Sequence, residues 1–289
     1  VTATTNSSSV IYDRAVPTLS AVTVTSNNDN SAYAKEGDIV TLSFTSSENL
    51  QSDPTVTIDG NAATVSGSNT TWTAAYTMQS GDTEGDVNFT IDFLDLASNS
   101  GSQVTTLTSG DKIVYDETVP TLPTVDISSD NSNGATFAKV GDVITISVSA
   151  SENIQTPTVT IAGNAAAIAT GSNGERVYTA TYTMQSSDNT GVIPFTVDFS
   201  DMANNAGTQV TAVANDSDGG VTFDKQAPSF TTVTMSSNNS TSTLAIVNDV
   251  ITINLTSDEA IKAGSDPTIT VNGNTATVTR NSTTSFTAT

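Results

Sequence analysis

The chain of 289 residues contains no cysteine and no histidine. Without these two residues, Cys–His nucleophilic machinery, thiolate redox centres and nearly all zinc, copper or haem sites are excluded. Serine and threonine hydroxyls are plentiful, but the side chains that usually activate such nucleophiles are missing. We therefore expect that the protein is not an enzyme.

Basic residues are also scarce, with 8 Lys+Arg against 30 Asp+Glu and a formal net charge of -22 at pH 7. A chain of this charge is repelled by the phosphates of nucleic acids and by anionic membrane surfaces. Long apolar runs are missing as well, and no stretch approaches the roughly 18 residues that a membrane-spanning helix requires. The sequence therefore predicts no nucleic-acid partner and no membrane insertion by this segment.

The sequence contains three copies of one pattern. The acidic landmark Glu48 recurs as Glu152 and Glu259, 104 and then 107 residues further along the chain. A period of this length is typical of an independent domain and too long for a solenoid repeat. The three stretches that match almost position for position are Ile39–Val65, Val143–Ile168 and Val250–Val278.

The frame of the repeat predicts four segments. They are the last strand and linker of a preceding repeat (1–15), two complete repeats (16–118 and 119–226) and a truncated third repeat (227–289). The end of the third repeat corresponds to Trp72–Ala75 of the first repeat. We therefore expect the sequence to be a window on a longer tandem array.

Within each copy, apolar residues alternate with Thr and Ser at a period of two, which indicates half-buried β-strands. In the first copy this holds for Val40, Leu42 and Phe44, and again for the stretches Trp72–Met78 and Val87–Phe93. About seven short strands in roughly 100 residues, without a helical pattern, predict an all-β sandwich with no disulfide. The regular alternation argues against disorder, although Ser, Thr and Asn are abundant.

Several short motifs occur in the same order in the copies, and they carry a resemblance to a known family. The chain resembles the bacterial immunoglobulin-like (Big-type) domains, which occur in tandem in large surface adhesins, surface-layer and fibre proteins and some marine phage appendages. The resemblance covers the whole chain, although the third copy departs from it at Asn248-Asp249. The motifs of the second copy are Gly141-Asp142, Ser151-Glu152-Asn153, Pro157–Ile161 and Asp201-Met202-Ala203-Asn204-Asn205.

The resemblance implies tandem immunoglobulin-like β-sandwiches that form a non-catalytic stalk of a long extracellular surface or fibre protein. Such a stalk extends and spaces an adhesive or assembly region. The expected partners are neighbouring repeats of the same chain, together with other copies in a fibre or layer, or glycans of a host or cell surface. Two alternatives stay open: a fibre or decoration protein on a virion surface, and a carbohydrate- or ice-binding module. The absence of cysteine fits a bacterial or phage array better than a eukaryotic one.

Acidic residues are predicted to gather at one end of each sandwich. In an immunoglobulin-like topology, the entering linker, the loop between the second and third strands and the loop before the last strand lie at that end. Three carboxylates there form an all-oxygen site that suits Ca²⁺, which takes about 6 to 8 oxygen ligands. The resemblance points the same way, because related adhesin arrays often bind Ca²⁺ at domain junctions. The candidate ligands are Asp13, Glu48 and Asp95 for the first repeat, Asp116, Glu152 and Asp201 for the second, and Asp224 and Glu259 for the third.

The side chains of Asn99 and Asn205 are candidates for additional oxygen ligands. The alternative to a metal site is that these acids are solvated loop residues, or that they accept hydrogen bonds from backbone N–H groups in turns. Asp38 is expected to be a turn residue of this kind. Trp72 has the parity of Tyr76 and is expected in the core, where it cannot serve as a sugar-binding platform.

Overall fold

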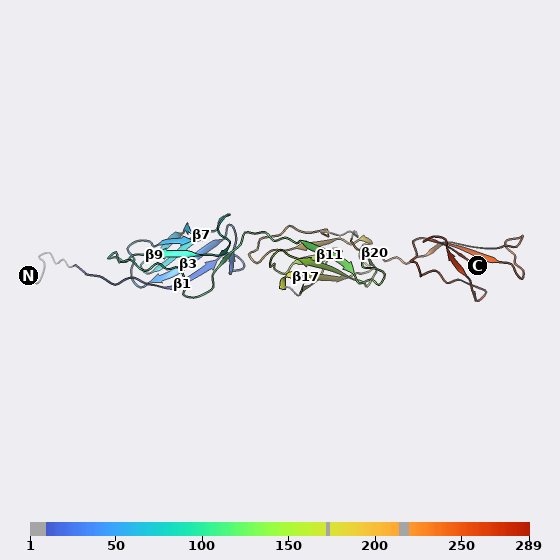
Figure 1. Ribbon diagram of the computed structural model, residues 1–289, viewed down its shortest axis with the longest axis horizontal. Coiled ribbons are helices and arrows are strands. Elements are labelled where there is room, and N and C mark those ends of the chain that lie inside the picture. The colour runs from blue at the N-terminus through green and yellow to red at the C-terminus, as the bar shows by residue number, and fades with distance from the viewer. Residues whose placement is uncertain (1–9, 172–173, 214–219) are drawn as a thin grey trace, which may run out of the picture. The chain divides into compact units, whose positions relative to one another are not determined.

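The computed structural model describes residues 10–171, 174–213 and 220–289 (Figure 1). The first nine residues of the predicted segment 1–15 lie outside this part of the chain. Every regular element in the described residues is a β-strand, as predicted. These residues contain no helix that is long and apolar enough to cross a membrane. The chain divides into two compact units, Val1–Phe223 and Asp224–Thr289.

The first repeat is a sandwich of two antiparallel layers. One layer has the strand order β1-β3-β7-β6, and the facing layer contains the order β5-β4-β9. A further small sheet, β2-β10-β8, contains a parallel pair between β2 and β10. The strands are β1 (Leu19–Ser26), β2 (Tyr33–Ala34), β3 (Ile39–Ser46), β4 (Thr55–Ile58), β5 (Asn61–Ala62), β6 (Thr64–Ser68), β7 (Thr71–Thr77), β8 (Gly85–Asp86), β9 (Phe89–Asp92) and β10 (Val114–Tyr115).

This strand order is that of an immunoglobulin-like sandwich. The four strands β1, β3, β7 and β6 correspond to the A-B-E-D sheet, and β4 and β9 correspond to strands C and F of the second sheet. An isolated bridge between Ile91 of β9 and Val104 begins the pairing of the last strand, which continues as β10 against β8. The order of the strands in the two sheets, and not only the number of strands, therefore identifies the immunoglobulin-like fold.

The predicted alternation places one face of each strand in the core. Val40, Leu42 and Phe44 of β3 are 0%, 0% and 2% exposed, whereas the Thr and Ser residues between them are half-buried. Trp72 lies opposite Phe44 across the β3–β7 pair and is 5% exposed, so its predicted place in the core is confirmed. Met78 is fully buried on the same face. Burial of such side chains contributes about 1.5–3 kcal/mol each.

The second repeat has the same topology, with β11-β13-β17-β16 facing β15-β14-β19 and a small sheet β12-β20-β18. Its core cluster contains residues from Val125 to Phe223 and is separate from the core cluster of the first repeat. The strands are β11 (Thr124–Ser129), β12 (Phe137–Ala138), β13 (Val143–Ser149), β14 (Thr158–Ile161), β15 (Asn164–Ala165), β16 (Ala167–Gly171), β17 (Gly174–Thr183), β18 (Gly191–Val192), β19 (Phe195–Asp198) and β20 (Thr222–Phe223).

The second unit repeats the four-stranded sheet as β21-β22-β26-β25, with a short β23-β24 hairpin. Phe286 and Ala288 are buried on this sheet, but Val233 and Met235 are 59% and 68% exposed. Val22, which matches Val233, is fully buried in the first repeat. The strands are β21 (Phe230–Ser237), β22 (Ile251–Ser257), β23 (Thr270–Val271), β24 (Asn274–Thr275), β25 (Val278–Arg280) and β26 (Ser285–Ala288).

The departure of the third copy at Asn248 has a backbone explanation. Gly37 and Gly141, at the same position in the other repeats, have φ values of +87° and +93°, and Asn248 has φ +79°. Asparagine is among the few residues other than glycine that adopt this region readily. The substitution therefore preserves the turn.

Candidate metal centre

Two loops that carry acids meet at one end of the first sandwich. The loop from β3 to β4 carries Glu48, and the hydroxyl of Ser46 donates a hydrogen bond of 2.7 Å to the main-chain carbonyl of Glu48. The loop that follows β9 carries Asp95, whose backbone forms a bridge with Leu50. The N–H of Gln51 donates to the carbonyl of Leu94 at 3.0 Å, so main-chain bonds hold the two loops together.

The carboxylate of Asp95 is held by its own loop. The N–H groups of Ala97 and Asn99 each donate to Oδ1 at 2.8 Å, and Nδ2 of Asn99 donates to Oδ2 at 2.7 Å. The residue is 0% exposed. Burial raises the pKa of Asp95, but the hydrogen bonds from Asn99 and from the backbone of Ala97 outweigh it and hold the pKa below its ordinary value of 3.8. The group is therefore a fixed, buried carboxylate anion.

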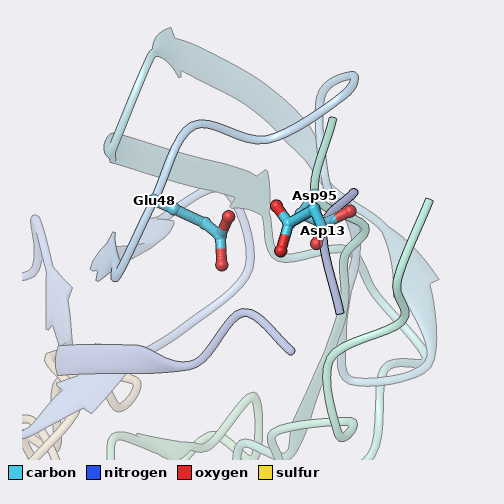
Figure 2. A group of neighbouring side chains, drawn as sticks. All are labelled: Asp13, Glu48 and Asp95. Atoms are coloured by element: carbon cyan, nitrogen blue, oxygen red, sulfur yellow. The ribbon is translucent and has the colours of Figure 1, made fainter. Parts of the chain in front are cut away.

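The linker brings a third acid to this place. Asp13, Glu48 and Asp95 each offer a carboxylate oxygen, and these oxygens all lie within 4.8 Å of one another. Figure 2 shows the carboxylate of Glu48 directed towards those of Asp13 and Asp95. Partial burial raises the pKa of Glu48, and the negative charges of Asp13 and Asp95 raise it further. The structure thus brings together the three residues predicted for the first repeat.

The same arrangement recurs in the second repeat. Oxygens of Asp116, Glu152 and Asp201 also lie within 4.8 Å of one another, and Asp201 is 0% exposed. The N–H and the Nδ2 group of Asn205 donate to the two oxygens of Asp201 at 2.8 and 2.7 Å. Burial raises the pKa of Asp116, and Asp201 and Glu84 raise it further. Burial also raises the pKa of Glu152, followed by the charges of Asp116 and Asp201.

A cavity of about 410 Å³ lies beside this second group. Its lining includes Glu84, Asp116, Ser151 and Glu152. Glu84 was not predicted as a site residue, yet its Oε1 accepts hydrogen bonds from the N–H of Glu117 and the hydroxyl of Thr118 and so fixes the linker. The corresponding position of the second repeat is Thr190, so no repeated acid signals Glu84 in the sequence.

Asn99 and Asn205, the candidates for additional oxygen ligands, both lie against the buried acids through their side-chain amides. Each residue turns its Nδ2 group towards the carboxylate of Asp95 or Asp201. A carboxylate anion can only accept hydrogen bonds, so it selects the donor end of the amide. The two asparagines therefore position the carboxylates of Asp95 and Asp201 through their Nδ2 groups.

The third repeat brings two of its predicted acids together. Burial raises the pKa of Glu259, and the charge of Asp224 raises it further, as do Asp258 and a hydrogen bond with Asp224. Asp258 accepts hydrogen bonds from the N–H and hydroxyl of Ser229 at 2.8 and 2.7 Å, which hold its pKa below the ordinary value. Within residues 224–289, no third carboxylate joins the pair Asp224 and Glu259 as in the other repeats.

Asp38 is a turn residue, as predicted. Its Oδ2 atom accepts hydrogen bonds from the N–H of Lys35 at 2.9 Å and from Nδ2 of Asn28 at 2.6 Å. Asp142 does the same for Lys139 and Asn131 in the second repeat. These acids stabilise the turn before β3 or β13 and belong to neither acidic group.

The donor set of each three-acid group fits a hard cation. It contains only oxygen donors, which favours Ca²⁺ or Mg²⁺ over softer transition metals. Ca²⁺ accepts irregular geometry and mixed carboxylate, carbonyl and water ligands, whereas Mg²⁺ demands near-octahedral geometry. A linker and two loops that each supply one carboxylate suit the more adaptable ion.

The comparisons with known proteins support neither the fold nor a function. Among solved structures, the chain is similar to one titled "Crystal Structure of Rst D1-D2", with 10% sequence identity and a TM-score of 0.31. The similarity covers 73% of this chain and 100% of that chain. No family model matches the chain, and a search of curated proteins finds no match. At this level of similarity, the comparison assigns no function.

Proposed function

We propose that the protein is a non-catalytic structural segment of an extracellular surface or fibre protein, in which Ca²⁺ fastens each linker to the sandwich that follows it. The observation that carries the proposal is the recurrence of one three-acid group in both repeats, assembled each time from the linker and two loops of the next sandwich. Solvated acids would be free to spread apart. These acids converge twice, in equivalent positions.

The physical role of the ion follows from the charges. Unit charges of the same sign about 4 Å apart repel by about 1 kcal/mol in water and by several times that near a protein surface. Without an ion, Asp116 is therefore pushed away from Glu152 and Asp201. A bound Ca²⁺ reverses the sign of this interaction and holds the linker to the loops. Monovalent salt screens the repulsion but does not bridge the three groups.

The setting that suits such a site is outside the cell. Calcium modules that work there have dissociation constants of about 10⁻⁴ to 10⁻³ M. In each group two of the three acids are partly or fully exposed to water, which suits that weak range. The high negative charge keeps neighbouring repeats soluble and discourages their association. We propose a cell-surface location, with neighbouring repeats of the same chain as the first partners and other copies or surface glycans as further ones.

A fibre on a virion would need the same fastening of each linker to the following sandwich. An antibody against this segment, used to label cells and released particles, separates a cell-surface stalk from a virion component. A glycan array and an ice-affinity assay test the remaining alternative, a carbohydrate- or ice-binding module. Binding in either assay would favour a role in recognition over the role of a structural stalk.

Calorimetric melting of the whole chain tests the proposal. We expect a higher melting temperature in 5 mM CaCl₂ (an excess of about fivefold or more over the expected dissociation constants) than in chelator. The variant Asp116→Ala should lose the calcium response of the second repeat and keep that of the first. Identical melting curves in calcium and in chelator would refute the calcium role.

A further inference from the structure

Three donor side chains of the first repeat contact three consecutive main-chain carbonyls of the second. Nδ2 of Asn30 donates to the carbonyl of Met202 at 2.9 Å, and Nδ2 of Asn28 donates to that of Ala203 at 2.9 Å. Nζ of Lys35 donates to the carbonyl of Asn204 at 2.5 Å. These carbonyls belong to the loop that begins at Asp201. We call Asn28, Asn30 and Lys35 the donor triplet.

The donor triplet is held in place by its own repeat. Asn28 Nδ2 also donates to Asp38, and Asn28 Oδ1 accepts from the N–H of Asn30 at 2.9 Å. The N–H of Lys35 donates to the same oxygen of Asp38. The turn residue Asp38 therefore fixes both ends of the segment that carries the triplet, so little ordering entropy is lost when the loop docks.

The loop presents its carbonyls because of its local conformation. Asn204 adopts φ +66°, which turns the chain sharply after Ala203. Nδ2 of Asn204 donates back to Oδ1 of Asn28 at 2.9 Å, so the contact runs in both directions. Asn205 ends the loop and donates to the linker carbonyl of Asp116 at 2.8 Å. One five-residue loop thus touches the first repeat, the linker and the second acidic group.

The first repeat supplies an internal comparison. Its equivalent loop, Asp95–Asn99, has the same positive φ at Ser98, but Leu96 is 68% exposed and Ala97 is exposed as well. In the second repeat, Ala203 is 0% exposed. The loop conformation alone therefore does not bury these residues, and the difference coincides with contact to the donor triplet.

We propose that the donor triplet is a docking surface for the Asp-x-Ala-Asn-Asn loop of the following repeat, and that this docking pre-orders the calcium site at Asp116, Glu152 and Asp201. The docking itself requires no ion, whereas its effect on calcium binding rests on the proposed function. Since binding free energies are linked reciprocally, calcium at this site also strengthens the docking. The ion and the triplet thus act on the same loop.

The third copy lacks two of the three donor residues, and the proposed docking gives this difference a physical meaning. The second repeat keeps all three donors, as Asn131, Asn133 and Lys139, whereas the third repeat has Thr241 and Ile246 in place of Asn30 and Lys35. An isoleucine cannot donate to a carbonyl, and threonine has a shorter reach. The third copy is therefore not built to capture a following loop in this manner.

The docking is tested by distances between the repeats, measured by pulsed electron spin resonance on the whole chain in chelator. The sequence has no native cysteine, so Ser66→Cys on β6 and Ala169→Cys on β16 place one spin label in each repeat. We expect a narrow distance distribution in the parent protein. The double variant Asn30→Ala and Lys35→Met should broaden it at least about twofold, because two of the three contacts are lost. An unchanged distribution would overturn the docking proposal.

The variants are chosen so that the fold survives. Neither substitution removes the N–H of Lys35 or the side chain of Asn28, so the turn around Asp38 keeps its hydrogen bonds. The matched control is Asn133→Ala with Lys139→Met, the same chemical change in the second repeat. The control should leave the distribution unchanged, and equal broadening by the control would show that the effect is not specific to the docked loop.

The coupling to calcium is tested by titration calorimetry with CaCl₂ on the charge-neutral variant Asn30→Ala. Replacement of Lys35 is avoided here, because removal of a positive charge would itself favour a cation. We expect calcium at Asp116, Glu152 and Asp201 to bind about fivefold more weakly, with the first site unchanged and no effect of Asn133→Ala. Unchanged affinity would overturn the coupling. No heat in the parent protein would refute the calcium proposal itself, while the distance measurement in chelator still decides the docking.

Discussion

Replacement of Glu152 by glutamine is expected to stabilise the second repeat in chelator and to weaken it in calcium. Within the described residues, the pKa of Glu152 responds to burial and to the charges of Asp116, Asp201 and Glu84, with an opposing contribution from Arg176. Among the described residues, no hydrogen bond to its carboxylate contributes to this shift. Glutamine has the same shape, so the substitution removes the charge and leaves the packing in place.

The size of the effect follows from the geometry. At the 4.8 Å limit that separates the acidic oxygens, two unit charges repel by about 0.9 kcal/mol in water and by about 3.5 kcal/mol at an effective dielectric constant near 20. Glu152 is partly exposed, so the lower value applies to its pair with Asp116 and to its pair with Asp201. The attraction to Arg176 offsets part of the sum. A net gain of about 1 kcal/mol remains, equal to about 4–8 °C for a domain of this size.

The assay is native-state hydrogen exchange of the amides in β14 and β17, which reports the local stability of the second repeat separately from that of the other repeats. The first repeat is an internal reference. In calcium the sign should invert, because the variant lacks a ligand. The control Asp126→Asn removes the same charge from an exposed site on β11. It should neither stabilise the second repeat in chelator nor weaken it in calcium. A variant that is no more stable than the parent in chelator would refute the repulsion argument.

Three further predictions concern the second repeat. In chelator, the raised pKa values of Asp116 and Glu152 mean that the folded state binds more protons, so stability should fall as pH rises above about 4 through these pKa values, and calcium should abolish the fall in the melting curves. Gly207→Ala should cost about 1–3 kcal/mol in chemical denaturation, because a Cβ there would lie 2.2 Å from the ring of Phe199; a neutral result would show that the ring can move aside. Tyr178→Phe should cost about 1–3 kcal/mol in the same assay, since it deprives a buried main-chain carbonyl of its 2.9 Å hydrogen bond, and an unchanged midpoint would contradict this.

Much of the fold could be predicted from the sequence, because a period of two and repeated landmarks are direct signals. The alternation in β3 and β7 translated into buried Phe44 and Trp72. The convergence of Asp116, Glu152 and Asp201 was predictable as well, since immunoglobulin-like topology brings a linker and two loops to one end. The repetition of these acids in register made the signal visible in a single chain.

The rest depended on groups that the sequence does not single out. The orientation of Asn205 is decided by the carboxylate beside it, and composition alone does not reveal which end of an amide will face an acid. The docking of Lys35 involves main-chain carbonyls, which every residue possesses. Glu84 supports the linker in one repeat only and therefore leaves no periodic trace.

The most direct test of the calcium sites is the number of ions that the whole chain binds, measured by titration calorimetry with CaCl₂. Two sites with dissociation constants near 10⁻³ M or below are expected, one at Asp13, Glu48 and Asp95 and one at Asp116, Glu152 and Asp201. Asp201→Ala should remove one of them, and Asp95→Ala together with Asp201→Ala should remove both. Absence of heat from the parent protein, or two sites that persist in the double variant, would contradict the assignment.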